Sequence, residues 1–258
     1  MSPSPVRSRR ARIVFALALS LPLALAGCCG PEYPDAPPGD HPVGPVFLCH
    51  GSWPDFPYWW TDDMAEALRA RGIEAVLVPY FVLSGIGTGA PAERIAAFEA
   101  KLRWRHARTE CRAPLRLAAV GYSSGTDVVL ESALAGAVYE RVYFGGSPLA
   151  LWNQDVERAL VRGRIKRLVN YFSPFDGLVW ITLGSGVYGY HAGGSAQHHV
   201  DNRVHFWLHV TPLFRRDTYL EEVSGELAAC AGLRHTCYDD ADYRAWYVAA
   251  RERLRTDW

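Results

Sequence analysis

Short apolar runs alternate along the chain with longer segments in which apolar residues recur at helical spacing. The runs have no polar face, which is typical of strands that a parallel sheet buries on both sides. The longer segments carry one apolar stripe each, such as Ile95, Phe98 and Leu102, and predict amphipathic helices. The predicted strands are 46–49, 75–78, 115–120, 141–144, 167–171 and 204–208; the predicted helices are 62–70, 92–108, 126–135 and 243–254, with a short helical insertion in 149–164.

This alternation predicts an α/β fold, with a mostly parallel central sheet and helices on both faces. The insertion at 149–164 is short, so any cap over the sheet is small. Open parallel sheets bind ligands at the carboxyl ends of their strands. We therefore expect the functional side chains directly after strands.

The N-terminal 27 residues have the features of a bacterial lipoprotein signal peptide. Four arginines precede the apolar run Ile13 to Ala26, whose 14 residues are too few to span a bilayer as a helix. The run ends in Leu-Ala-Gly-Cys28, which resembles a lipobox, in which the cysteine is lipidated; an ordinary secretory signal with a chance cysteine is the alternative. We expect removal of 1–27, lipid on Cys28, and a Pro/Gly-rich tether, 28–45, that holds the domain 46–258 at a membrane surface of the cell envelope.

Charge and cysteine usage narrow the partners and the compartment. The whole chain has 27 Lys and Arg against 27 Asp and Glu, and the four charges in the predicted signal are all basic, so the mature chain carries about −4. This balance argues against nucleic acid as a partner. Export favours a disulfide between Cys230 and Cys237, whereas Cys49 and Cys111 are expected at opposite ends of strands and unpaired.

A Gly-Tyr-Ser-Ser-Gly sequence at 121–125 lies between a predicted strand and a predicted helix. It matches the G-x-S-x-G pattern in the strand–turn–helix context that this pattern requires. The turn is tight and its central residue strained, so small residues must flank it, and the hydroxyl of Ser123 is lifted clear of the backbone. A Gly/Ser-rich loop that caps a helix is the alternative; the placement favours Ser123 as a nucleophile.

Together with the strand and turn Val-Phe-Leu-Cys-His-Gly at 46–51, this turn resembles those of the lipases and esterases of the α/β-hydrolase superfamily. The resemblance implies an oxyanion hole made by the backbone N–H groups of Ser52 and Ser124. It assigns His50 to the structure of the turn rather than to proton transfer. It also implies that an acid and then a histidine follow the serine along the chain, and that no cofactor is needed.

Asp176 is the expected acid, because it follows the strand at 167–171 in a Pro/Gly turn; a solvated turn aspartate is the alternative. His209 is the expected base, because it ends the predicted strand at 204–208, where the family places its histidine. His205, inside that predicted strand, is the second candidate. The histidine-rich stretch also offers ligand types, but in no recognised metal motif, so we expect no metal: His198, His199, Asp201 and His205.

The expected function is hydrolysis of a carboxylic ester, of a small molecule or a lipid, through an acyl-enzyme on Ser123. The aromatic stretch 52–60 either walls an acyl pocket or covers the sheet as core. A non-catalytic envelope lipoprotein that retains the fold as a binding scaffold is the alternative from another class.

Overall fold

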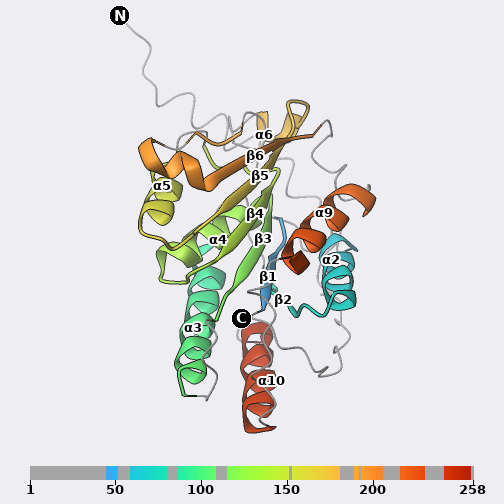
Figure 1. Cartoon of the computed structure of the whole chain (residues 1–258), viewed down its shortest axis with the longest axis vertical. Helices are drawn as coiled ribbons and strands as arrows, with labels where there is room; N and C mark the ends of the chain where they lie inside the picture. Colours follow the sequence, from blue (N-terminus) through green and yellow to red (C-terminus); the bar gives the residue numbers. More distant parts are fainter. Residues whose placement is uncertain are drawn as a thin grey trace, which may run out of the picture. The chain divides into compact units, whose positions relative to one another are not determined.

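Six parallel strands form one sheet at the centre of the computed structural model (Figure 1). The structure describes residues 45–51, 59–80, 87–108, 115–150, 153–180, 189–191, 193–205, 216–229 and 241–256, all within the second of two units, 36–258, into which the chain divides. The strand order is β2-β1-β3-β4-β5-β6. The strands are β1 Val46–Cys49, β2 Ala75–Leu77, β3 Ala118–Tyr122, β4 Arg141–Gly145, β5 Leu168–Phe172 and β6 Val200–Val204.

Helices cover both faces of this sheet, as predicted, and alternate residues of each strand point to opposite faces. One face packs Phe47 and Phe144 against four helices, and the other packs Leu48 and Tyr143 against two. The first layer contains α3 Gly89–His106, α4 Gly125–Leu134, α5 Gln154–Val161 and α10 Ala241–Thr256; the second contains α2 Trp59–Ala70 and α9 Arg216–Ala229. A short α6 Gly177–Trp180 and a 3-10 helix Gly194–His199 complete the described elements. None of the described helices has the length and apolar character needed to cross a membrane.

The strand order places a topological switch point between β1 and β3. After β1 the chain moves outward to β2, and after β3 it moves the other way to β4. The loops that leave the carboxyl ends of β1 and β3 therefore diverge, which is where open parallel sheets bind ligands. We call this side the carboxyl edge and the opposite side, where the strands begin, the amino edge.

Most predicted elements are confirmed with boundaries shifted by a few residues, and the predicted apolar stripe of α3 is buried. Trp60, within the aromatic stretch 52–60, is 3% exposed and packs on the ring of Tyr122, so this aromatic belongs to the core. Cys49 is buried and forms no disulfide, as expected. Residues 1–44, with Cys28, lie outside the described part, as do Cys111, Cys230 and Cys237.

The described sixth strand begins four residues before the predicted strand at 204–208, of which 206–208 lie outside the described residues. The sixth strand is 200–204 (VDNRV), and it ends before His205. It is an edge strand whose polar side chains are satisfied laterally: Asn202 accepts from Tyr190 N at 2.7 Å, and Arg203 donates to Asp201 at 2.8 Å. A polar sequence pairs as a strand here because its side chains bond to partners that a local sequence pattern does not reveal. The apolar residues that follow it are the reason that the sequence predicts a later strand.

Candidate active site

Ser123 lies at the carboxyl edge, in the single turn between β3 and α4. Its φ is +52°, and it is the one non-glycine residue with positive φ in the described ranges. The left-handed conformation costs an L-residue about 1–2 kcal/mol, because Cβ approaches the following carbonyl oxygen. The Ser123 N–H donates to the Gly145 carbonyl at 2.9 Å, which ties the turn to the end of β4. This strained turn is the geometry that the G-x-S-x-G pattern predicts.

The glycines around Ser123 have no room for a side chain. A Cβ on Gly121 would lie 2.8 Å from the Gly125 carbonyl oxygen, and a Cβ on Gly125 would lie 2.6 Å from the Cys49 carbonyl carbon. A Cβ on Gly51 would lie 3.2 Å from the Ser123 Cβ and 3.7 Å from its Oγ. The turn after β1 is therefore packed directly against the serine, as the resemblance implied for the His-Gly turn.

Two buried hydroxyls hold this turn from below. Thr126 Oγ1 donates to the Ser123 carbonyl at 2.7 Å and lies 3.0 Å from Ser147 Oγ. Ser147 Oγ in turn accepts from the Leu149 N–H at 3.3 Å. Neither hydroxyl is predicted from the sequence to belong to the site. Thr126 carries a weak local signal, since Thr in a first helical turn often bonds back to the chain, but Ser147 comes from the segment after β4 and gives no signal near the serine.

His50 is a structural residue, as the resemblance implied. Its ring stacks on Tyr80, with centroids 4.1 Å apart, and the Tyr80 hydroxyl donates to the His50 carbonyl oxygen. Burial lowers the pKa of His50 to about 4, against the opposing effect of the hydrogen bond to the Gly51 carbonyl. The imidazole is therefore neutral at physiological pH and packed between backbone and aromatic ring.

Asp176 lies after β5 at the same edge and is fully buried, which excludes the solvated turn residue. Its Oδ1 accepts from the Val179 N–H at 3.1 Å, in the first turn of α6. Burial and, second, the negative charge of Asp176 raise the pKa of Tyr122, the residue immediately before Ser123. The carboxylate therefore lies close enough to the turn at Ser123 to act on its neighbour electrostatically.

His205 is the described histidine that directly follows β6. Its backbone N–H donates to the Phe172 carbonyl at 2.8 Å. His205 therefore lies beside the end of β5, from which the chain continues to Asp176. Its Nε2 lies 4.0 Å from Glu222 Oε2, and its ring centroid is 5.2 Å from that of Tyr171. Burial lowers the pKa of His205, the carboxylate of Glu222 opposes this, and Arg203 reinforces it.

The sequence favours His209 over His205 because the predicted strand at 204–208 ends at His209. The described strand β6 ends earlier, at Val204. His205 is at the carboxyl end of β6 rather than inside it. His209 itself, and with it Ser52, lies outside the described residues, so their predicted roles stay predictions.

The other two described histidines among these candidate ligands lie before β6. His198 and His199 are exposed and precede β6, so they lie toward the amino edge, where His199 Nδ1 is 2.9 Å from the Lys166 carbonyl. Within the described ranges, no three His, Cys, Asp or Glu side chains gather as a metal site would require.

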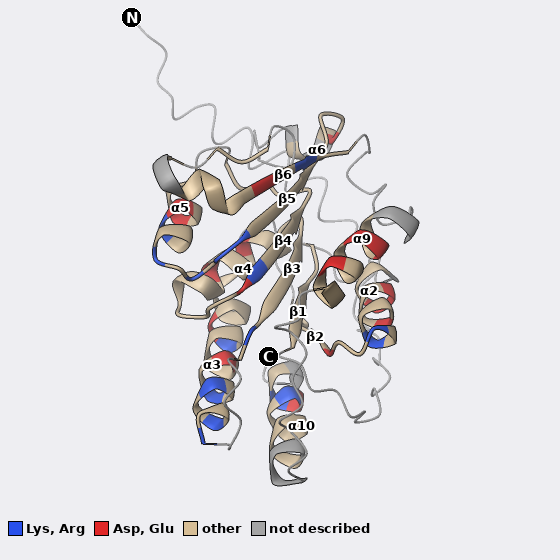
Figure 2. Cartoon of the chain, viewed as in Figure 1, with Lys and Arg blue, Asp and Glu red and all other residues tan. Residues whose placement is uncertain are grey.

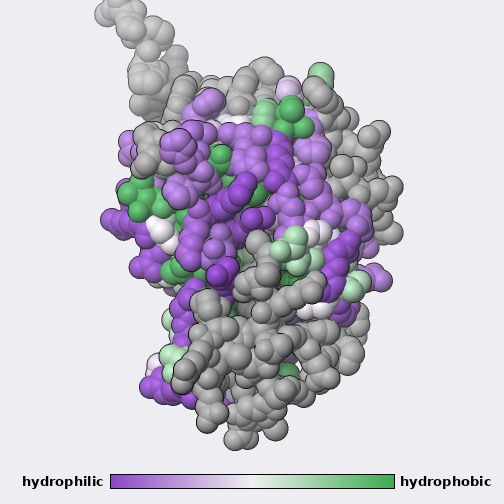
Figure 3. Space-filling model, viewed as in Figure 1, coloured by the Kyte–Doolittle hydropathy of each residue, from purple (hydrophilic) through white to green (hydrophobic). Residues whose placement is uncertain are grey.

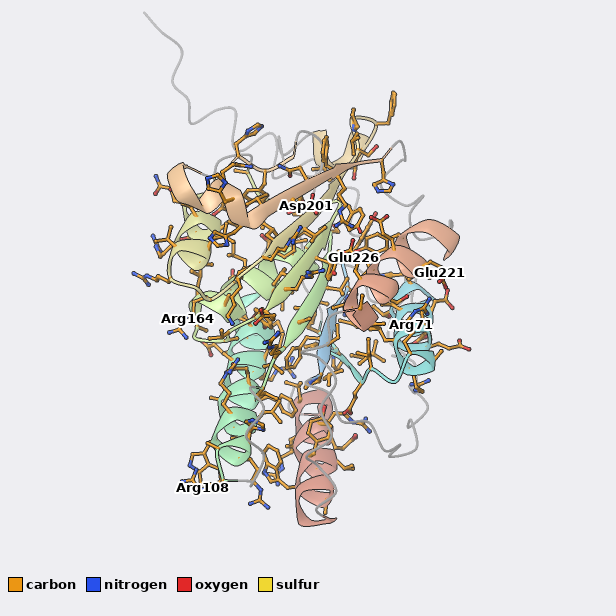
Figure 4. The ribbon with its side chains drawn as sticks, viewed as in Figure 1. Arg71, Arg108, Arg164, Asp201, Glu221 and Glu226 are labelled. Carbon is orange, nitrogen blue, oxygen red and sulfur yellow. The ribbon has the colours of Figure 1, made fainter. Side chains whose placement is uncertain are left out.

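A charged network that the sequence analysis missed joins β6 to α9 (Figure 4). Arg203 pairs with Asp201 at 2.8 Å and with Glu222 at 2.6 Å, and it also contacts Glu226 and the Tyr171 hydroxyl. Glu226 accepts from the Tyr143 hydroxyl at 3.0 Å. The partners come from three strands and one helix, so no local spacing could have revealed them. The network fixes α9 beside His205.

No protein-family model matches the chain, and no curated protein is detectably similar in sequence. Solved structures do match. A cold-adapted esterase from an Arctic intertidal metagenomic library aligns with a TM-score of 0.50 and 18% identity, over 75% of this chain and 85% of that one. The esterase domain of a Rhodothermus marinus protein aligns at 0.48 and 17%, over 76% and 90% of the two chains, and an α/β hydrolase from a Medee basin deep-sea metagenome library at 0.46 and 12%, over 83% and 84%. The all-parallel sheet, the strained turn after β3 and the likeness to the Arctic esterase together show that the chain has the α/β-hydrolase fold.

Proposed function

We propose that the chain is a serine hydrolase that cleaves carboxylic esters through an acyl-enzyme on Ser123, with Asp176 and His209 as the other members of the triad. The observation that carries the proposal is the left-handed backbone of Ser123, at a turn packed against Gly51. Fold alone does not establish chemistry. Strain in a non-glycine residue, maintained by three crowded glycines and two buried hydroxyls, is typical of a functional turn.

The chemistry follows from this arrangement. The histidine accepts the Ser123 proton as Oγ attacks the ester carbonyl, and Asp176 holds the imidazole in the correct tautomer and stabilises its charged form. The backbone N–H groups of Ser52 and Ser124 stabilise the oxyanion, with each such donor contributing about 3 kcal/mol in comparable sites. The imidazole gives this proton to the departing alcohol. Water then attacks the acyl-enzyme while the histidine accepts its proton, and the histidine returns that proton to Ser123 Oγ as the acid is released.

A fluorophosphonate probe tests the nucleophile. We expect the full chain to be labelled and the Ser123→Ala variant to remain unlabelled, with ester turnover reduced by about 10⁴-fold or more. Ser124→Ala, which removes the adjacent hydroxyl but keeps the backbone N–H, is the matched control and should keep its labelling. A folded wild type that resists the probe would instead favour the non-catalytic scaffold. A panel of esters with increasing acyl length, run on the same variants, would then define the substrate class.

Two histidine variants identify the base. His209→Gln should lower kcat by about 10³-fold or more, whereas His205→Gln should keep most activity and change stability through Glu222 and Tyr171. The reverse result would move the base to His205. In either case kcat should fall as the pH drops through the imidazole pKa, because the protonated ring cannot accept the serine proton.

The proposed location is the cell envelope, with the chain held at a membrane surface by lipid on Cys28. The support is the order of basic residues, apolar run and Leu-Ala-Gly-Cys in the sequence. Cells that express the chain with labelled palmitate should incorporate label into wild type and not into Cys28→Ala. Equal incorporation would remove the lipid anchor from the proposal without touching the hydrolase.

A further inference from the structure

The last two turns of α3 carry a dense group of cationic side chains at the amino edge, whereas Ser123 lies at the carboxyl edge. Residues 101–108 (KLRWRHAR) contain four Lys or Arg residues and one His, and no Asp or Glu. Figure 2 shows these cations gathered at the lower end of α3. We call Lys101, Trp104, Arg105, His106 and Arg108 the basic end of α3.

Ion pairing distinguishes the cations at this end of α3. Lys101 and Arg108 are exposed, and among the described residues neither they nor Arg105 form an ion pair. By contrast, Arg103, on the inward side of the same turn, pairs with the buried Glu99 and donates to the Val138 carbonyl at 2.9 Å. The helix thus carries one cation that pairs with a buried carboxylate and two exposed cations, Lys101 and Arg108.

An exposed aromatic lies among these cations. Trp104 is 54% exposed, and the guanidinium of Arg108 stacks 3.5 Å from its ring centroid. Arg105 lies over the ring of Trp246 on α10, at 5.9 Å. Most of the described surface in the view of Figure 3 is hydrophilic, with hydrophobic residues in small groups. An exposed Trp between basic side chains combines a ring suited to the lipid headgroup region with charges that attract anionic lipids.

The chain enters the domain at the same edge. β1 begins at Val46, and Val46 pairs with Ala118 at the start of β3, the strand that follows α3 along the sequence. Residue 45, where the described part of the chain begins, therefore lies at the edge that carries the basic end of α3.

We propose that the basic end of α3 binds the surface of an anionic phospholipid membrane. The mature chain is acidic overall, at about −4, so it would be repelled from such a surface unless a local group of cations faced it. Docking through the amino edge points Ser123 away from the bilayer, toward substrates that arrive from the aqueous side. The proposal is independent of whether Ser123 is a nucleophile.

Vesicle co-sedimentation of the full chain tests the proposal. The quantity measured is the ratio of partitioning onto phosphatidylcholine–phosphatidylglycerol vesicles to partitioning onto phosphatidylcholine alone. Wild type and variants carry the same residues 1–27, so the arginines and the apolar run of that segment contribute equally to every ratio that is compared. Each Lys or Arg near an anionic surface is worth about fivefold in partitioning. We expect Lys101→Glu/Arg108→Glu to lower the ratio by about 25-fold or more, and added salt to lower the wild-type ratio toward unity.

Two controls locate the contact. Lys101→Arg/Arg108→Lys keeps the charge and should keep the wild-type ratio. Arg69→Glu/Arg162→Glu makes the same change in net charge at exposed positions of α2 and just after α5 and should keep most of the ratio. Circular dichroism and thermal melting of each variant establish that it is folded. A loss as large in the second control would show that overall charge, rather than α3, sets the preference, and would overturn the proposal.

Quenching of tryptophan by brominated lipids is the second measurement and needs no charge variant. Wild type should be quenched on anionic vesicles more than Trp104→Phe, because Trp104 enters the headgroup region. Equal quenching, no preference for anionic vesicles, or binding of double-stranded DNA without binding of vesicles would each contradict a membrane-binding surface.

Discussion

The backbone of Ser123 stores strain that neighbouring residues maintain. At φ +52° a serine is about 1–2 kcal/mol less stable than in a right-handed conformation. Ser124, one residue later, has φ −60° and belongs to the start of α4. The two serines of the motif are therefore chemically identical but conformationally opposite, and this difference can be measured.

Ser123→Gly should be more stable than Ser123→Ala by about 1 kcal/mol, because only glycine adopts positive φ without a Cβ clash. At Ser124 the order should invert, with Gly less stable than Ala by about 1 kcal/mol, since the residue lies in the right-handed region at a helix end. Urea unfolding of the four variants measures both differences. The same order at both positions would contradict the strained turn.

Gly125 shows how little room the turn leaves. Ala at this position would place Cβ against the Cys49 and His50 carbonyls, which belong to β1 and the turn after it, so neither can move away cheaply. We expect Gly125→Ala to cost about 3 kcal/mol or more and to remove probe labelling. Gly225→Ala, inside α9 with nothing within 4 Å of the new methyl, should instead stabilise the chain by about 0.5–1 kcal/mol. Thermal and urea unfolding compare the two.

At the scale of elements, β6 and α9 depend on each other. β6 is a polar edge strand, and α9 supplies Glu222 and Glu226 to its Arg203. Planar guanidinium suits several carboxylates at once, which a lysine does not. His205 follows this strand and faces the same helix, so the network supports one border of the carboxyl edge.

Arg203→Met should therefore destabilise the chain by about 1–3 kcal/mol, because three carboxylates lose a common partner that is itself half-buried. Arg203→Lys should recover part of the loss. Native-state hydrogen exchange should place the faster exchange in α9 and β6. Uniform acceleration through all strands, or a cost below about 0.3 kcal/mol, would show that the network does not hold these elements together.

At the scale of the whole molecule, two half-buried carboxyl groups tie stability to pH. Burial raises the pKa of Asp127 to about 7, with Glu131 adding to the effect, and burial raises that of Glu74 to about 7 against the opposing Arg251. Both pKa values exceed those in the unfolded chain, so the folded state binds more protons between the two values. Their contribution to stability is complete below about pH 4 and is lost as the pH rises through about 7.

Asp127→Asn should remove part of this dependence. The variant should gain Tm relative to wild type as the pH is raised from about 5 to about 8, because the wild type must ionise a desolvated carboxyl over that range. Glu93→Gln, at an exposed position of α3, should shift Tm equally at both pH values. Differential scanning calorimetry measures Tm of wild type and of both variants at the two pH values. A constant difference between Asp127→Asn and wild type would contradict the raised pKa.

The sequence by itself determined the elements whose information is local. Apolar runs defined the five strands that are buried on both faces, the stripe at Ile95, Phe98 and Leu102 defined α3, and the glycines at 121 and 125 defined the turn at Ser123. Each signal works because burial period and turn sterics act over a few neighbouring residues. The turn that follows a strand identifies Asp176 as the candidate acid, but these neighbouring residues do not reveal whether its side chain is buried.

Only the tertiary structure decided what depends on distant partners. β6 pairs as a strand because Asn170, Tyr190 and α9 satisfy its polar groups. The strand ends at Val204, and His205 follows it. Ser147, which follows β4, supports the turn at Ser123 through Thr126. The order of the strands in the sheet places the basic end of α3 at the same edge as the start of β1. Hydrogen bonds and ion pairs between segments far apart in sequence leave no periodic trace, so three-dimensional packing alone decides them.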